Sequence, residues 1–137
     1  MKPINVGLLG VGTVGGGTFT VLQRNAEEIS RRAGRSIHIT VVADKDMVRA
    51  KELTQGSCRV ITDAFEVVTD KEVDVVVELI GGTGVAKDLV LMAIANGKHV
   101  VTANKALLAK HGNEIFAAAQ AKGVMIGFEA EIGRAHV

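Results

Sequence analysis

A glycine-rich stretch near the N-terminus has the residue types and the spacing of a phosphate-binding turn. Gly10, Gly12 and Gly15 follow an apolar run, and a helical pattern begins directly after them. In this order the first glycine permits a sharp turn, the second leaves room for a pyrophosphate, and the third lets the helix pack closely on the strand. Thr13 and Val14 would present first-turn N–H groups, which a helix cannot satisfy internally, to the phosphates. The spacing predicts a dinucleotide-binding turn, and the alternative is a turn that holds no ligand.

An acidic residue follows the next apolar run, at the place where this type of turn has its ribose contact. Asp44 comes directly after that run, and an acid there favours NAD because it would repel the 2′-phosphate of NADP. Lys45 and Arg49 follow closely and could bind that phosphate instead. The sequence therefore leaves NAD and NADP both open. The alternative role for Asp44 is that of a residue in a strand-ending turn.

Two later loops carry further candidate residues. Gly81, Gly82 and Thr83 follow a valine-rich run, and the two glycines would let the backbone approach the ribose or the nicotinamide. The alternative is a tight turn without a ligand. Lys105 follows the next apolar run. A lysine there could bind phosphate or orient a carbonyl or carboxylate substrate. The alternative is a solvated lysine at a helix start. Because ligands bind where parallel strands end, these loops are expected to share one crevice.

Alternating strands and helices must position these loops. Strands are predicted over Ile4–Leu9, Ile37–Ala43, Arg59–Ile61, Val73–Leu79, His99–Thr102 and Val124–Phe128. Helices are predicted over Thr13–Arg32, Met47–Thr54, Ala64–Val68 and Val85–Asn96, followed by a helical region capped by Asn104, a break at Gly112 and a second helix over Asn113–Lys122. The strands are too apolar for a sheet with one solvated face. The pattern predicts an α/β fold with a doubly wound parallel sheet, of the Rossmann type, in the strand order 3-2-1-4-5-6.

Composition limits the remaining classes of function. The 137 residues carry a formal net charge of +1 with scattered basic residues, which argues against a nucleic-acid surface. No apolar run approaches the roughly 20 residues of a membrane span, and neither a membrane segment nor a signal peptide is expected. The single cysteine, Cys58, excludes an internal disulfide and a cysteine-rich zinc site, favours a reducing cytosol, and is expected to pack. His38, His99 and His111 are not spaced as ligands and are expected to be structural.

Four motifs together closely resemble the N-terminal cofactor domain of the homoserine dehydrogenase family. They are Gly7–Gly15, Asp74–Gly82, Val100–Ala109 and Phe128–Ala130, and the resemblance spans about residues 2–130. It implies an NAD(P)-dependent oxidoreductase that interconverts aspartate 4-semialdehyde and L-homoserine, on the route to threonine, methionine and isoleucine. It also implies a cytoplasmic enzyme, dimeric through a domain outside this chain. The alternatives are another NAD(P)-dependent semialdehyde or amino-acid dehydrogenase, or a non-catalytic module that senses NAD(H).

The resemblance also implies roles for single residues. Thr13 and Val14 would contact the pyrophosphate, and Lys105 would lie beside the nicotinamide and the substrate. Glu129 matches a position whose carboxylate helps to hold a monovalent cation, usually sodium, with a strand-end carboxylate as the alternative. The main acid–base lysine of the family would belong to the substrate domain.

The chain departs from the family pattern after Ala130. The family continues there with a glycine-rich run, whereas this sequence reads Glu131–Val137, which back-translates to a common sequencing-adapter read. We therefore expect residues 1–130 to form the cofactor domain, residues 131–137 to be non-native, and the substrate domain to be missing. A chain with only the cofactor side of the cleft is expected to bind NAD(P) weakly and to have no turnover.

Overall fold

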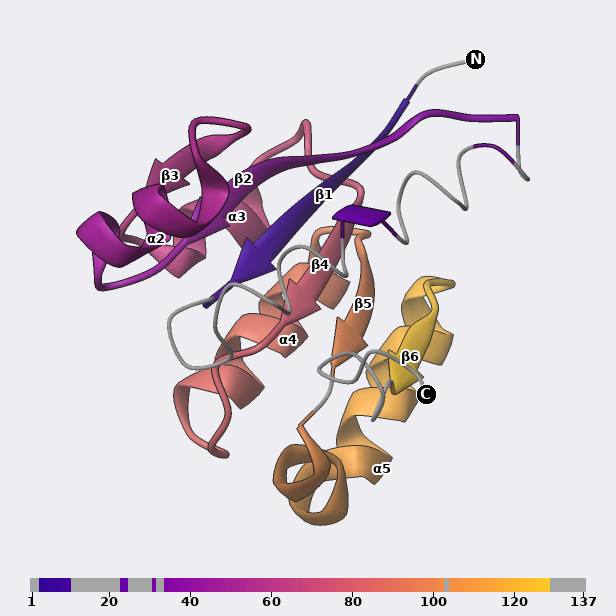
Figure 1. Cartoon of the computed structure of the whole chain (residues 1–137). Helices are drawn as coiled ribbons and strands as arrows, with labels where there is room; N and C mark the ends of the chain where they lie inside the picture. The colour runs from indigo at the N-terminus through magenta and orange to yellow at the C-terminus, as the bar shows by residue number, and fades with distance from the viewer. Residues whose placement is uncertain (1–2, 11–22, 25–30, 32–33, 103, 129–137) are drawn as a thin grey trace.

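A single parallel sheet organises the chain. The structure, a computed structural model, describes residues 3–10, 23–24, 31, 34–102 and 104–128 (Figure 1). The sheet has the strand order β3-β2-β1-β4-β5-β6, which confirms the predicted fold class and topology. The strands are β1 (Ile4–Leu9), β2 (Ile37–Ala43), β3 (Arg59–Ile61), β4 (Val75–Glu78), β5 (His99–Thr102) and β6 (Ile126–Phe128). The helices with described bounds are α2 (Met47–Thr54), α3 (Ala64–Thr69), α4 (Val85–Ala95) and α5 (Lys105–Lys122).

Both faces of the sheet are apolar. Successive strand residues point to opposite faces, and each face packs into its own buried cluster. Leu9, Val41 and Val76 join one buried cluster with the apolar side chains of α3, α4 and α5, which cover the same face of the sheet (Figure 1). Leu8 and Val42 join a second cluster, which includes Ala50 of α2. This two-sided burial explains why the strand sequences read as nearly continuous apolar runs.

Helix α3 approaches β1 so closely that only glycine fits at position 7. A Cβ atom built on Gly7 would lie 2.5 Å from Cγ1 of Val67 and 3.3 Å from Cγ1 of Val73. A separation of 2.5 Å is shorter than carbon atoms tolerate, so α3 could not keep its present position against a larger residue.

Strand β4 is shorter than the predicted Val73–Leu79. Its ladder with β1 runs from the Val6–Val75 pair to the Leu9–Glu78 pair. Single backbone hydrogen bonds continue the contact at both ends, because Asp74 N donates to Asn5 O and Leu79 N donates to Leu9 O. The apolar run is therefore longer than the segment of β4 that pairs with β1.

The predicted break at Gly112 is wrong. Helix α5 runs without interruption from Lys105 to Lys122, with Gly112 buried inside it. Leu107, Ile115 and Ala119 share its buried face and belong to the same cluster as α4. A glycine inside a helix costs only about 1 kcal/mol relative to alanine, so burial of this face maintains the helix through it.

Other boundaries differ by one or two residues. α3 extends to Thr69, α4 ends at Ala95, and β6 begins at Ile126. The predicted helix over Thr13–Arg32 lies largely outside the described residues. Within the described ranges, no helix combines the length and the apolar character needed to cross a membrane.

Candidate functional site

The candidate site lies where β1, β4 and β5 end side by side. Leu9 pairs with Glu78, and Glu78 pairs with Thr102, so the carboxyl ends of the three strands are level (Figure 1). Gly10 follows β1, the Gly81–Thr83 loop follows β4, and Lys105 begins α5 just after β5. The structure therefore brings together, at one edge of the sheet, the three loops that the sequence singled out.

Gly10 has a conformation that favours glycine. Its φ is 84°, and its N–H donates to the carbonyl oxygen of Ala43, at the end of β2, over 2.7 Å. A Cβ atom there would lie 3.2 Å from Cγ1 of Ile80, in the loop after β4. The turn is thus held against both neighbouring strands. The other predicted residues of this turn, Gly12, Thr13, Val14 and Gly15, lie outside the described residues, and their role stays a prediction.

The backbone conformation at positions 81 and 82 favours glycine, whereas the space around them does not require it. Their φ values are 84° and 76°, both left-handed, and no atom lies within 4 Å of a Cβ built on either residue. Both are exposed, and Thr83 beside them is half-buried. Gly84 then begins α4 without a side-chain capping bond. Open backbone at the two glycines and a helix start without a side-chain cap suit the approach of a ligand.

A buried polar cluster underlies these loops. It consists of Glu78, Thr102 and Asn104, of which Glu78 and Thr102 have 0% exposure. Thr102 Oγ1 donates to Glu78 Oε1 over 2.6 Å, and Gly81 N donates to Glu78 Oε2 over 3.0 Å. The carboxylate therefore connects the end of β5 to the glycine loop after β4.

Asn104 completes the connection from the other side. Its Nδ2 donates to the carbonyl oxygen of Gly82 over 2.6 Å, while its own N–H donates to Thr102 Oγ1 over 3.0 Å. Its Oδ1 accepts from Leu107 N and so caps α5, as the sequence predicted. Lys105, the first residue of α5, is exposed directly beside this cap.

The sequence did not reveal the roles of Glu78 and Thr102. A glutamate inside a valine strand was the available signal, because a buried charged group requires hydrogen-bonding partners. The partners themselves are 24 residues apart in the chain, so the spacing gave no indication of the pair.

Asp44 takes the turn role that the sequence named as its alternative. Its Oδ1 accepts from Asp46 N over 2.9 Å, and its N–H donates to Ile61 O. Lys45 and Arg49 are exposed beside it. A contact of Asp44 or Lys45 with a ribose or a 2′-phosphate remains a prediction.

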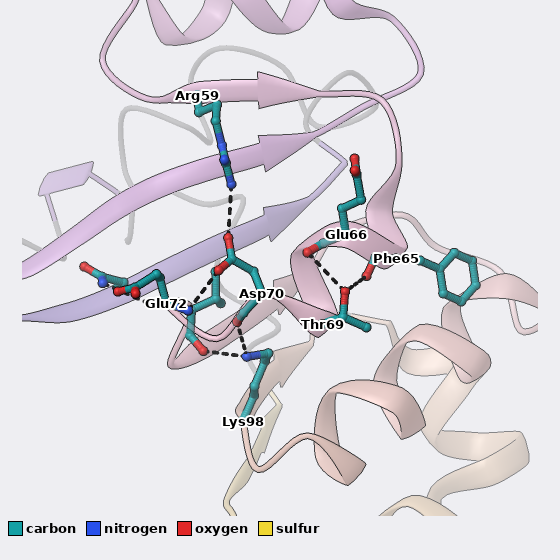
Figure 2. A network of polar contacts seen from close by, with 9 residues as sticks. Arg59, Phe65, Glu66, Thr69, Asp70, Glu72 and Lys98 are labelled. Atoms are coloured by element: carbon teal, nitrogen blue, oxygen red, sulfur yellow. Dashed lines mark hydrogen bonds and ion pairs between the residues drawn. The ribbon is translucent and has the colours of Figure 1, made fainter.

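A second polar network lies at the amino ends of the strands, where β3 and β5 begin. Lys98 Nζ donates to the carbonyl oxygens of Asp70 and Val73 over 2.5 and 2.7 Å, and the carboxylate of Asp70 pairs with Arg59 over 3.0 Å (Figure 2). Burial lowers the pKa of Lys98, and the carboxylates of Asp70 and Asp74 oppose this shift. The network joins the α3–β4 connection to β5, away from the candidate site.

Two further titratable residues, His99 and Cys58, make structural contacts. His99 Nδ1 accepts from Met125 N over 3.0 Å. Burial raises the pKa of the Cys58 thiol, against hydrogen bonds from Ser57 and Thr54, which makes the thiol less reactive. Among the described residues, no group of three or more His, Cys, Asp or Glu side chains could hold a metal ion. Glu129, the predicted cation ligand, lies outside the described residues.

Several known proteins that are similar to this chain are homoserine dehydrogenases. A family model for the homoserine dehydrogenase NAD binding domain matches residues 10–129. Homoserine dehydrogenases from Pseudomonas aeruginosa and Neisseria gonorrhoeae are 58% and 57% identical over 132 residues, which cover 96% of this chain and 30% of each relative. The crystal structure of a homoserine dehydrogenase from Thiobacillus denitrificans matches with a TM-score of 0.86 and 65% identity, over 95% of this chain and 30% of that one. The chain thus spans about 30% of the length of these relatives.

Proposed function

The chain belongs to the homoserine dehydrogenase family, as its NAD-binding domain, and from this premise we propose that it forms the cofactor side of an enzyme interconverting aspartate 4-semialdehyde and L-homoserine. The reaction would serve threonine, methionine and isoleucine biosynthesis. Residues 1–130 would be the cofactor domain, and residues 131–137 would lie outside it. The substrate side of the cleft, with its acid–base lysine, would come from a part of the relatives that this chain does not span.

One observation supports the proposal most strongly: two glycine loops that suit a dinucleotide follow the carboxyl ends of the neighbouring strands β1 and β4. Gly10 has a left-handed turn at the end of β1, and the left-handed Gly81–Gly82 pair leaves open backbone at the end of β4. Both features fit the close approach of a phosphate or a ribose. The bound NAD(P) would supply or accept the hydride.

The residues that would hold the cofactor fall into groups along this edge. The first loop, with Gly10, Gly12, Thr13, Val14 and Gly15, would hold the pyrophosphate. Asp44 and Lys45 would lie near the adenosine ribose, where the acid favours NAD and the lysine favours NADP. Gly81, Gly82, Thr83 and Lys105 would approach the nicotinamide half.

Lys105 is the residue of this chain that we assign to the substrate side of the cofactor. It is exposed at the start of α5, beside the capping residue Asn104. A lysine there would attract and orient a carbonyl or carboxylate group close to the nicotinamide.

A binding titration tests the proposal on the chain itself. NADPH and NADH fluorescence, followed as the chain is added, is expected to report weak but saturable binding. Homoserine oxidation by the same sample is expected to be absent, because the substrate side of the cleft is not supplied. Failure to bind either cofactor would contradict the proposal, and turnover by the chain alone would contradict its second part.

A substitution separates the enzyme from a module that only senses NAD(H). In the full-length enzyme, Lys105→Ala is expected to reduce kcat/KM by about 10²-fold or more, since it removes a group that orients the substrate. Lys110→Ala, another exposed lysine of α5, is the matched control. Unchanged turnover in Lys105→Ala would remove the catalytic assignment and favour a sensing role.

Three finer assignments rest on the resemblance of the sequence motifs. We propose that Glu129 contributes a carboxylate oxygen to a sodium site in the full-length enzyme, which a sodium dependence of activity would test. We also propose a homodimer formed through the part of the relatives that this chain does not span. A cytoplasmic location agrees with a biosynthetic oxidoreductase and with the single, half-buried cysteine.

A further inference from the structure

We propose that Glu78 and Thr102 act as a positioning pair that holds the loops after β4 and β5 in one arrangement and thereby sets the affinity for the nicotinamide half of the cofactor. The inference rests on the proposed function, because the two loops carry the residues assigned to that half. It adds two residues that would touch neither the cofactor nor the substrate.

The position of Glu78 is unfavourable unless its carboxylate has a specific task. It lies in β4 between strands on both sides, fully buried, after three consecutive valines. The two donors described for it are a backbone N–H and a hydroxyl, both neutral. Replacing buried charged groups by apolar residues of similar volume often causes no loss of stability. A carboxylate at this place therefore points to control of geometry.

The hydrogen bonds form a closed ring between the two loops. From Gly81 the ring passes through Glu78 to Thr102, then through the Asn104 N–H and side chain to the carbonyl of Gly82, next to Gly81 in the chain. Moving either loop alone would break at least one of these bonds. The two loops are therefore coupled.

The ring also fixes the direction of one backbone donor. The Gly82 carbonyl points at Asn104 Nδ2, over 2.6 Å. Because a trans peptide bond is planar, the N–H of Thr83 points the opposite way from that carbonyl. Left-handed glycines would otherwise leave this peptide free to rotate, since they tolerate many conformations. The ring thus selects one orientation of the loop that would meet the cofactor.

The central experiment compares two substitutions of Thr102 in the full chain. Thr102→Val keeps the shape but removes the hydroxyl, so Glu78 Oε1 and Asn104 N each lose a partner. Thr102→Ser keeps the hydroxyl and therefore the ring. NADPH titration is expected to give a Kd about tenfold or more higher for Thr102→Val and within about twofold of the unsubstituted chain for Thr102→Ser.

A second ligand separates positioning from general stability. ADP-ribose lacks the nicotinamide, so its Kd is expected to stay within about twofold in every variant. Ile115→Val, a cavity-forming change in the buried face of α5, serves as a control that weakens the core and leaves the ring intact. It is expected to leave both Kd values unchanged.

A second variant covers the case in which Thr102→Val does not fold. Asn104→Ser retains a side-chain oxygen that caps α5, but its side chain is too short to reach the Gly82 carbonyl. It is expected to weaken NADPH binding by about tenfold while the ADP-ribose Kd is maintained.

The outcomes are distinct. An unchanged NADPH Kd in folded Thr102→Val or in Asn104→Ser would overturn the positioning role and leave the proposed function standing. A parallel loss for NADPH and ADP-ribose, shared by Ile115→Val, would assign the pair to stability alone and also overturn it. Absence of both NADPH and NADH binding by the unsubstituted chain would overturn the proposed function itself, and the inference with it.

Discussion

Among the single residues, Gly7 shows how closely this fold packs. The methyl group of an alanine at this position would lie 2.5 Å from Val67 Cγ1, so α3 or β1 would have to move. We expect Gly7→Ala to lower the free energy of unfolding by about 1–3 kcal/mol, the usual cost of overpacking a core. Urea denaturation measures this difference.

Two further variants test the cause of that loss. Gly127→Ala places a methyl group 3.8 Å from Val101 Cγ2, which is ordinary contact, and is the matched control within the same sheet. Val67→Ala removes the clashing atom, so the double variant Gly7→Ala/Val67→Ala is expected to lose less stability than the sum of the two single changes. Strict additivity would show that Val67 is not the obstacle.

Lys98 gives a prediction that depends on pH. Burial lowers the pKa of Lys98 in the folded chain below its ordinary value, against the pull of Asp70 and Asp74. Between the folded and unfolded pKa values the unfolded chain binds more protons, so stability rises with pH in that window. The neutral amine keeps two N–H donors for the carbonyls of Asp70 and Val73.

Denaturation of the unsubstituted chain and of Lys98→Met at neutral and at alkaline pH tests this. The variant is expected to be less stable throughout, by about 1–3 kcal/mol, because the buried Val73 carbonyl loses the Lys98 donor while the Asp70 carbonyl still accepts from Val73 N. The gap is expected to widen as pH rises towards the ordinary pKa of lysine. Exposed Lys110→Met controls for the loss of one lysine. A gap that narrows with pH would contradict the assignment.

At the scale of elements, α5 offers a stabilising change. A Cβ atom built on Gly112 would lie 3.7 Å from Cε2 of Phe116, which is ordinary van der Waals contact. We therefore expect Gly112→Ala to raise the free energy of unfolding by about 0.5–1 kcal/mol, the helix-propensity difference between the two residues. Thermal unfolding followed by circular dichroism measures it.

The control lies at the end of the same helix. Gly123 caps α5 in a left-handed conformation with φ 76°, which alanine adopts only with strain. Gly123→Ala is expected to destabilise the chain by about 1 kcal/mol. A destabilising Gly112→Ala would mean that α5 and α4 pack more tightly at this point than the contact indicates.

The sequence predicted elements well where local signals are strong. The bounds of β1, β2, β3, β5 and α2 agree with the structure to the residue, because glycines and capping residues mark their ends. The limits of β4 depended on its partner β1, and the continuity of α5 depended on packing. Neither property is local, so the pattern of apolar residues did not contain it.

The candidate site shows the same division. Its glycines and Lys105 were found because turn residues after apolar runs are visible in the sequence. The Glu78–Thr102 bond and the contacts of Lys98 join residues 24 to 28 positions apart. Only the strand order brings such residues together, and no spacing rule links them in advance.

For the whole molecule, the order of the strands predicts an order of stability. β1 and β4 lie inside the sheet, and Leu8, Leu9 and Val76 are completely buried, whereas β3 and β6 are three-residue strands at its two edges. We expect amide hydrogen exchange to be slowest in β1 and β4, where opening requires global unfolding, and faster in β3 and β6, where local opening suffices. Edge strands protected as long as β1 would contradict this order.

One polar network lies at the amino ends of the strands and the other at their carboxyl ends. This separation has a consequence for protein engineering. The Lys98–Asp70 network joins elements at the amino ends of the strands, whereas the loops assigned to the cofactor leave the carboxyl ends. A library that randomises positions 44 and 45 to exchange NAD for NADP would leave both the Lys98 anchor and the Glu78–Thr102 pair intact. If the proposed assignment of Asp44 and Lys45 holds, the preference between NAD and NADP is expected to change without loss of either network, at the cost of the turn bond from Asp46 N to Asp44 Oδ1.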